Sequence, residues 1–124
     1  MPTIELTADD FEKTVTSPGI TLVDFWAAWC GPCRQFAPVF DKASESNADV
    51  TFAKVDTDAE QALAGAAGIT SIPTLMAFRD GVIVFSQPGA LPAPALDQVI
   101  AAVRELDMDE VHAKIAAQHP APVS

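Results

Sequence analysis

The chain has 124 residues, which is the length of one domain and enough to bury a hydrophobic core. Hydrophobic residues make up 49% of the chain, a proportion that argues against intrinsic disorder. Its 17 acidic and 7 basic residues give a formal charge of −10, which argues against binding to the phosphate backbone of nucleic acids.

The first third of the chain is predicted to form two strand–helix pairs. Residues 3–6 favour a short strand, and Thr7 and Asp10 give a capping-box pattern for a helix that ends at the turn residues 17–19. Residues 20–26 are apolar on both faces, which is typical of a central buried strand. The helix that follows carries an apolar stripe made of Phe36, Val39, Phe40 and Ala43.

The middle of the chain is predicted to contain one further strand and a short helix. The strand covers residues 50–55. Thr57 and Glu60 give a second capping-box pattern, which predicts an alanine-rich helix from Ala59. The helix is expected to stop near Gly65 or Gly68.

A hairpin and a long helix are predicted next. Residues 75–78 and 82–85 favour strands, and the Asp80-Gly81 pair between them is a hairpin turn signal. Residues 89–93 are predicted as a loop, after which Pro94 suits the first turn of a helix. The apolar stripe of this helix is Leu96, Val99, Ile100, Val103 and Leu106.

The last part of the chain is predicted to add a helix to this domain. Asp107 and Glu110 favour a helix start, and Met108, Val111 and Ile115 fall on one side of it. We expect this amphipathic helix to pack on the surface of the domain, with docking of a partner as the alternative. The predicted division is a main domain over 1–106, a helical extension over 107–118 and a flexible tail over 119–124.

No export or membrane segment is expected from the sequence. Residues 1–5 have neither the basic start nor the apolar stretch of a secretory signal. The most apolar run, residues 22–29, is interrupted by Asp24 and is too short to span a bilayer. We therefore expect a cytoplasmic protein, and in a reducing compartment a cysteine pair is more often catalytic than structural.

Both cysteines of the chain lie in the stretch Trp29-Cys30-Gly31-Pro32-Cys33, between the predicted central strand and the helix after it. Cys30 is therefore expected beside a helix N-terminus, where unpaired N–H groups and the helix dipole favour an anion. This placement lowers the pKa of a thiol, and the thiolate is the nucleophilic form of cysteine. The pattern indicates a redox site.

Two other interpretations of the cysteine pair were weighed. A structural disulfide between Cys30 and Cys33 would close a loop so short that it constrains the unfolded chain very little. A zinc site would need two more ligands, and His112 and His119 fall in the C-terminal segment. No metal site is expected.

The Trp-Cys-Gly-Pro-Cys stretch resembles the active site of the thioredoxin family. The order of predicted strands and helices up to Leu106 is also similar to the thioredoxin fold. This resemblance implies an α/β protein with a central mixed five-stranded sheet flanked by helices on both faces. The segment after residue 106 would then be an extra C-terminal helix.

Asp24 and Lys54 are the candidate residues behind the cysteines. A carboxylate in a buried apolar strand is costly unless it is paired or protonated, and desolvation should raise the pKa of Asp24. The resemblance implies that Asp24 relays the proton of Cys33, directly or through water. It also places Lys54 near Asp24, where it would temper the rise in pKa. The alternative is an idle Asp24, satisfied by the backbone or by Lys54.

The resemblance further implies a shallow client-binding surface around the cysteines. Pro73 matches the cis-proline of the family, and the backbone before it would pair with an extended client segment. Two alanines, Ala27 and Ala28, separate the tryptophans where the family usually has a charged residue, which bears on partner preference. The remaining residues expected on this surface are Trp29, Gly31, Pro32, Ile72 and Gly89.

The function implied is that of a protein disulfide reductase and electron carrier. Cys30 would be the nucleophile and Cys33 the resolving thiol, with the Cys30–Cys33 disulfide as the redox centre and no bound cofactor. The resemblance implies recharging by an NADPH-dependent thioredoxin reductase and disulfide-containing client proteins, and we expect a monomer. The alternatives are a dedicated reductant for a single client enzyme and a binding or scaffold module in which redox activity is incidental.

Overall fold

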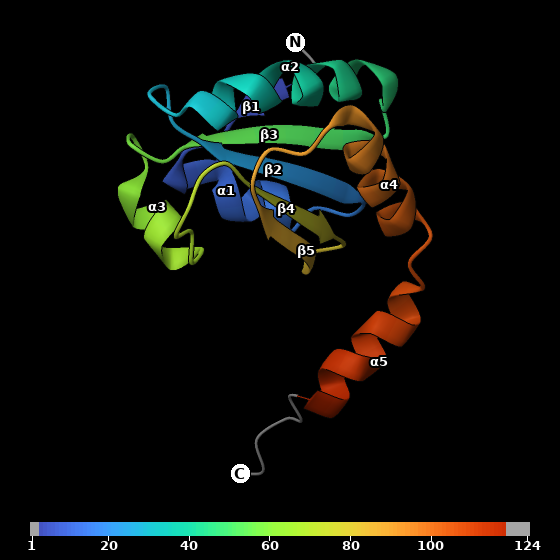
Figure 1. Ribbon diagram of the computed structural model, residues 1–124. Coiled ribbons are helices and arrows are strands. Elements are labelled where there is room, and N and C mark those ends of the chain that lie inside the picture. The colour runs from blue at the N-terminus through green and yellow to red at the C-terminus, as the bar shows by residue number, and fades with distance from the viewer. Residues whose placement is uncertain (1–2, 119–124) are drawn as a thin grey trace.

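Five strands form one mixed sheet in the computed structural model, which describes residues 3–118 (Figure 1). The spatial order of the strands is β1-β3-β2-β4-β5. β3 runs parallel to both β1 and β2, whereas β4 is antiparallel to β2 and to β5. The strands are β1 (Thr3–Glu5), β2 (Ile20–Trp26), β3 (Val50–Asp56), β4 (Thr74–Arg79) and β5 (Val82–Pro88).

Helices cover both faces of this sheet, as expected. Successive side chains of β2 point to opposite faces, so Leu22 packs with α2 and α4 while Val23 packs with residues of α1. The predicted thioredoxin-like layering of helix, sheet and helix is therefore confirmed. The helices are α1 (Ala8–Val15), α2 (Gly31–Ser46), α3 (Gln61–Ala66), α4 (Ala93–Arg104) and α5 (Met108–Gln118).

β2 is buried because it has a strand on each side and helices on each face. Its residues from Ile20 to Phe25 are all buried. An aromatic cluster packs on the α2 face, where the rings of Phe40 and Phe52 meet edge to face at 5.1 Å between centroids. This packing fixes where β2 ends and α2 begins, and the cysteine pair lies at that junction.

The predicted start of α3 is wrong. The helix begins at Gln61 rather than at Ala59, and the expected capping box between Thr57 and Glu60 does not form. Thr57 Oγ1 instead donates a hydrogen bond to the carbonyl of Trp26, at 3.0 Å. The Glu60 carboxylate accepts the N–H of Ala8 at 2.8 Å, which satisfies a free donor in the first turn of α1. A distant partner therefore overrides the local capping pattern.

The hairpin between β4 and β5 is confirmed, and β5 is longer than predicted. Asp80 and Gly81 both have positive φ, of 52° and 83°, as the mirror-image hairpin turns require. β5 continues three residues beyond Phe85 because Gln87 and Pro88 still pair with β4. The longer strand brings the chain back to the start of β4, beside Pro73.

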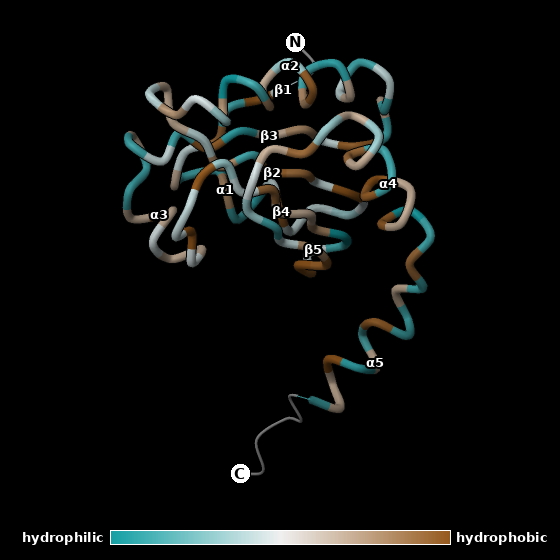
Figure 2. The backbone as a smooth tube through the Cα atoms, in the orientation of Figure 1, coloured by the Kyte–Doolittle hydropathy of each residue, from teal (hydrophilic) through white to brown (hydrophobic). Residues whose placement is uncertain are grey.

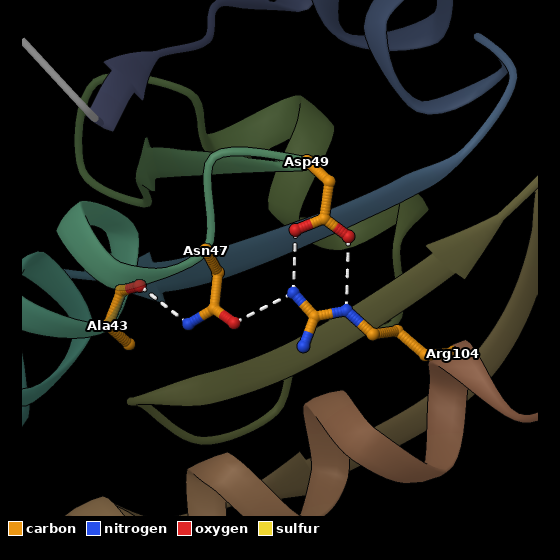
Figure 3. A network of polar contacts seen from close by, with 4 residues as sticks. All are labelled: Ala43, Asn47, Asp49 and Arg104. Carbon is orange, nitrogen blue, oxygen red and sulfur yellow. Dashed lines mark hydrogen bonds and ion pairs between the residues drawn. The ribbon is translucent and has the colours of Figure 1, made fainter.

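The C-terminal end of α4 is held by two arginines. Arg79 Nη1 donates to the carbonyls of Val103, Arg104 and Leu106, which would otherwise lack partners at the helix end. Arg104 in turn forms a bidentate pair with Asp49 and a further bond to Asn47 (Figure 3). These hydrogen bonds lower the pKa of the exposed Asp49 and tie α4 to the turn between α2 and β3.

The C-terminal helix does not pack on the domain as expected. No residue of α5 is buried, and Figure 1 shows the helix extending away from the sheet. Its apolar side is narrow, and polar residues alternate with apolar ones along it (Figure 2). The predicted tail over residues 119–124 lies outside the described residues. Over residues 3–118, no helix is both long and apolar enough to cross a membrane.

Candidate active site

Cys30 is the N-cap residue of α2. Its backbone is extended, with φ of −85° and ψ of 114°, and its sulfur accepts the N–H of Cys33 at 3.2 Å. Gly31 and Pro32 occupy the first two helical positions, and Pro32 costs no hydrogen bond there because that N–H would lack a helical partner. The strand-to-helix turn thus directs the positive end of the helix at the Cys30 sulfur.

The two cysteines form a disulfide, with their Cα atoms 5.2 Å apart. Both are buried: Cys30 is 4% exposed and Cys33 is 2% exposed. The two sulfurs therefore differ little in exposure in this oxidised state. What distinguishes them is position, because Cys30 caps the helix while Cys33 lies inside its first turn.

Three predicted surface residues gather beside Cys30. The Cys30 sulfur lies 3.7 Å from the carbonyl oxygen of Ile72, which packs against the cysteine pair. The Ile72–Pro73 peptide bond is cis. Gly89 donates its N–H to the Pro73 carbonyl at 2.7 Å and has a φ of +101°, a conformation that L side chains rarely adopt. The end of β5 therefore supports the turn that faces the sulfur.

Trp29 is the most exposed large hydrophobic residue of the site, at 67%. Its indole Nε1 donates a hydrogen bond to Asp58 Oδ2 at 2.9 Å. Asp58, which the sequence analysis did not single out, therefore fixes one edge of this exposed ring. Its place in the turn after β3 is a weak signal, because acidic residues are common in turns for local reasons.

Asp24 is fully buried on the α2 face of β2. It is 0% exposed, and neither of its oxygens has a hydrogen-bond partner among the described residues. Burial raises the pKa of Asp24 to about 7, while the charge of Lys54 lowers it and that of Asp41 raises it. The idle, hydrogen-bonded aspartate considered as an alternative is not what the structure contains.

A small cavity connects Asp24 with Cys33. Its volume is about 90 Å³, which is large enough for water, and Asp24, Arg34 and Lys54 place polar groups in a lining that is otherwise mostly apolar. Trp26 lines it and is only partly buried, and Lys54 lies above the Trp26 ring at 5.7 Å from its centroid. The full lining is Asp24, Trp26, Cys33, Arg34, Ala37 and Lys54.

Lys54 lowers the pKa of Asp24, as expected, but it does not form an ion pair with Asp24. The two residues are register partners on β3 and β2, but the Lys54 ammonium lies 3.7 Å from Asp41 Oδ1 instead. Lys54 therefore acts on Asp24 through space rather than through a contact. Asp41 is a second site residue that the sequence analysis missed, because nothing local in α2 distinguishes it from other exposed carboxylates.

The part of the chain that the structure describes contains no group of three or more His, Cys, Asp or Glu residues placed to hold a metal ion.

Comparison with known proteins gives one consistent result. A family model described as thioredoxin matches residues 2–102. A Streptomyces coelicolor protein whose name assigns it to the thioredoxins is 58% identical over 116 residues, which covers 94% of this chain and 87% of that protein. The thioredoxin of Bacillus subtilis is 42% identical over 86 residues, covering 68% of this chain and 83% of that protein.

A solved structure gives the same relationship in three dimensions. A variant of the thioredoxin from Halobacterium salinarum superposes with a TM-score of 0.78 at 34% sequence identity. The match covers 85% of this chain and 93% of that one. The predicted fold is therefore confirmed over the domain that carries the cysteines.

The buried carboxyl group predicts an unusual dependence of stability on pH. Because the pKa of Asp24 is raised in the folded state, its contribution to stability is fully present below the unfolded value of about 3.9 and is lost as the pH rises through about 7. The shift corresponds to a loss of about 4 kcal/mol by pH 8. Asp24→Asn should therefore match the wild type at pH 4 and be more stable by several kcal/mol at pH 8.

Urea denaturation of the oxidised proteins at both pH values measures this difference. Asp97→Asn, which changes an exposed carboxylate on α4, is the matched control and should move the free energy of unfolding by less than about 0.5 kcal/mol at either pH. Parallel pH–stability curves for Asp24→Asn and the wild type would show that the carboxyl group is not held in its neutral form.

Proposed function

The chain belongs to the thioredoxin family of protein disulfide reductases, and we propose how its residues divide that reaction among themselves. Cys30 is the nucleophile, Cys33 the resolving thiol and Asp24 the proton relay, while Lys54 tunes Asp24. The observation that carries the proposal is the small cavity that joins the unpartnered Asp24 carboxyl group to Cys33.

The first step is attack on a client disulfide by the Cys30 thiolate. The helix N-terminus stabilises the thiolate, since the Cys30 sulfur already accepts the Cys33 N–H. A bond forms between Cys30 and one client sulfur, the client disulfide breaks, and the departing client thiolate takes up a proton. The product is a mixed disulfide between Cys30 and the client.

The second step is attack by Cys33 on the Cys30 sulfur. Cys33 is shielded from solvent, so its proton has to leave through the protein. Asp24 accepts that proton, directly or through water in the cavity, and its pKa of about 7 suits both uptake and release near neutral pH. The Cys30–Cys33 disulfide forms as the Cys30–client bond breaks, and the second client sulfur leaves as a thiolate that takes up a proton from Asp24 or from solvent. The client has then gained two electrons and two protons.

Client binding in this proposal uses the surface beside Cys30. Ile72 and Trp29 offer apolar contacts. Gly31 and Pro32, in the first turn of α2, complete this surface. The backbone before Pro73 pairs with an extended client segment, as in other cases of strand addition. Gly89 supports that turn through its hydrogen bond to the Pro73 carbonyl.

The oxidised protein has to be reduced again before it can act on another client. An NADPH-dependent thioredoxin reductase returns the Cys30–Cys33 disulfide to the dithiol, and the chain itself binds no cofactor. We propose that it acts as a cytoplasmic monomer on several disulfide-containing clients. The support is its family membership, because a member of a family of general reductants needs a reductase partner to turn over.

The unequal roles of the two cysteines predict different behaviour of two matched variants. Cys33→Ser can attack but cannot resolve, so it should accumulate covalent adducts with client proteins that disappear when a reductant is added. Cys30→Ser lacks the nucleophile and should form few or none. Non-reducing electrophoresis after incubation with oxidised cell extract measures both, and equal trapping by the two variants would contradict the division of labour.

The division of the chain is also part of the proposal, with residues 1–106 as the reductase domain, 107–118 as a separate helical extension and 119–124 as its tail. The exposed α5 supports this division, since it contributes no buried residue to the domain. The match to the Streptomyces coelicolor relative covers 94% of the chain and must therefore reach into α5. This shared extension favours a docking role for α5 over an incidental one.

Truncation after Leu106 tests whether disulfide reduction is independent of α5. The truncated protein keeps the Leu106 carbonyl that Arg79 binds, so the free energy of unfolding should fall by less than about 1 kcal/mol. Insulin reduction should stay within about twofold of the full chain, measured by turbidity with dithiothreitol as electron donor. A large loss of insulin reduction by a folded truncated protein would show that the extension belongs to the active site.

A further inference from the structure

Among the charged groups around Asp24, Asp41 has no role in the reaction described so far. On the α2 face of β2, Asp24 faces Lys54 from β3 and Arg34 and Asp41 from α2. Arg34 lines the same cavity, and its Nη1 donates to the Ala28 carbonyl at 2.9 Å. On β4 the register partner of Asp24 is the uncharged Leu75, and the buried residues that α4 packs on this face of the sheet are apolar: Leu96, Ile100 and Val103.

Lys54 is the cation whose charge acts on Asp24. It is the register partner of Asp24, and side chains paired across neighbouring parallel strands point to the same face. A buried carboxylate without a partner is costly, so a direct Lys54–Asp24 ion pair would be the expected arrangement. The structure has a different one, in which the Lys54 ammonium lies 3.7 Å from Asp41 and both Asp24 oxygens stay unpartnered.

The position of Asp41 explains why Lys54 pairs with Asp41 and not with Asp24. Asp41 follows Cys33 by eight residues on α2, with Ala37 of the cavity wall between them, so it lies at the outer end of the cavity. Its side chain is 55% exposed, compared with 16% for Lys54. An ammonium at this mouth keeps part of its hydration, whereas one drawn in to Asp24 would lose it.

We propose that Asp41 is a positioning residue for disulfide exchange, because its carboxylate holds Lys54 at the mouth of the cavity and prevents a direct ion pair with Asp24. This inference rests on the proposed role of Asp24 as proton relay. A direct pair would keep Asp24 ionised at neutral pH, and its carboxylate could then no longer exchange a proton with Cys33 in that range. Asp41 therefore keeps Asp24 able to exchange a proton near neutral pH, although it forms no hydrogen bond with Asp24.

A double-mutant cycle on the titration of Asp24 tests this inference. The readout is the ¹³C chemical shift of the Asp24 side-chain carboxyl group in the oxidised protein, followed from pH 4 to pH 10. Asp41→Asn frees Lys54 to pair with Asp24 and should lower the midpoint of the Asp24 titration by about one pH unit. In a Lys54→Met background the same substitution should have much less effect, because no cation is left to release.

Glu45→Gln is the matched control, since it removes the same charge from an exposed position one turn further along α2. It should leave the midpoint nearly unchanged. An equal fall on Asp41→Asn in both backgrounds would mean that Asp41 acts only through its own charge, and no fall in either would mean that it does not act on Asp24 at all. Both results would overturn the positioning role.

The relay itself is tested separately, by the rate of disulfide exchange of Asp24→Asn. A wild-type rate for that variant would remove the relay and with it any role of Asp41 in exchange, whatever the titrations give. Slower disulfide exchange by Asp24→Asn, together with the predicted titration midpoints, supports both the relay role of Asp24 and the positioning role of Asp41. The titration and the rate therefore distinguish a failure of this inference from a failure of the proposed function.

Discussion

The burial of the Asp24 carboxyl group is the constraint on which the rest of the site depends. A central strand with neighbours on both sides and helices on both faces shields the group from bulk solvent, and none of the described side chains donates to it. The folded protein therefore favours the neutral acid, at a cost to stability that grows as the pH rises. A domain with a marginal free energy of folding keeps such a group only where it is used.

The fold brings three separate segments of the chain together at one end of β2, where the site lies. The strand carries Asp24, the first turn of α2 carries both cysteines, and the hairpin strands β4 and β5 bring Ile72, Pro73 and Gly89 to the Cys30 sulfur. The helix that directs its N-terminus at the Cys30 sulfur also carries Asp41, about two turns after Cys33. In the proposed reaction, the nucleophile, the proton acceptor and the residue that adjusts that acceptor thus lie on two neighbouring elements, β2 and α2.

Much of this arrangement is predictable from the sequence because its signals are local or carried by a motif. The apolar run of β2, the helical stripes and the cysteine motif predicted the sheet, the helices and the place of the disulfide. Long-range contacts were not predictable in this way. Glu60 caps a different helix from the one its pattern suggested, Lys54 of β3 pairs with Asp41 of α2, and Arg79 of β4 binds the carbonyls at the end of α4. Each of these depends on side chains that are neighbours only after folding.

The pH dependence of single-turnover insulin reduction tests the account most directly. The reduced protein and its Asp24→Asn variant would be mixed with insulin in a stopped-flow instrument from pH 5 to pH 9. If Asp24 accepts the proton of Cys33, the wild-type rate should rise with an inflection near pH 7, and the variant should lack that inflection and be slower by about tenfold or more near neutral pH. If the variant keeps both the inflection and the wild-type rate, the inflection reports the titration of a thiol. That result would contradict the claim that Asp24 moves the proton.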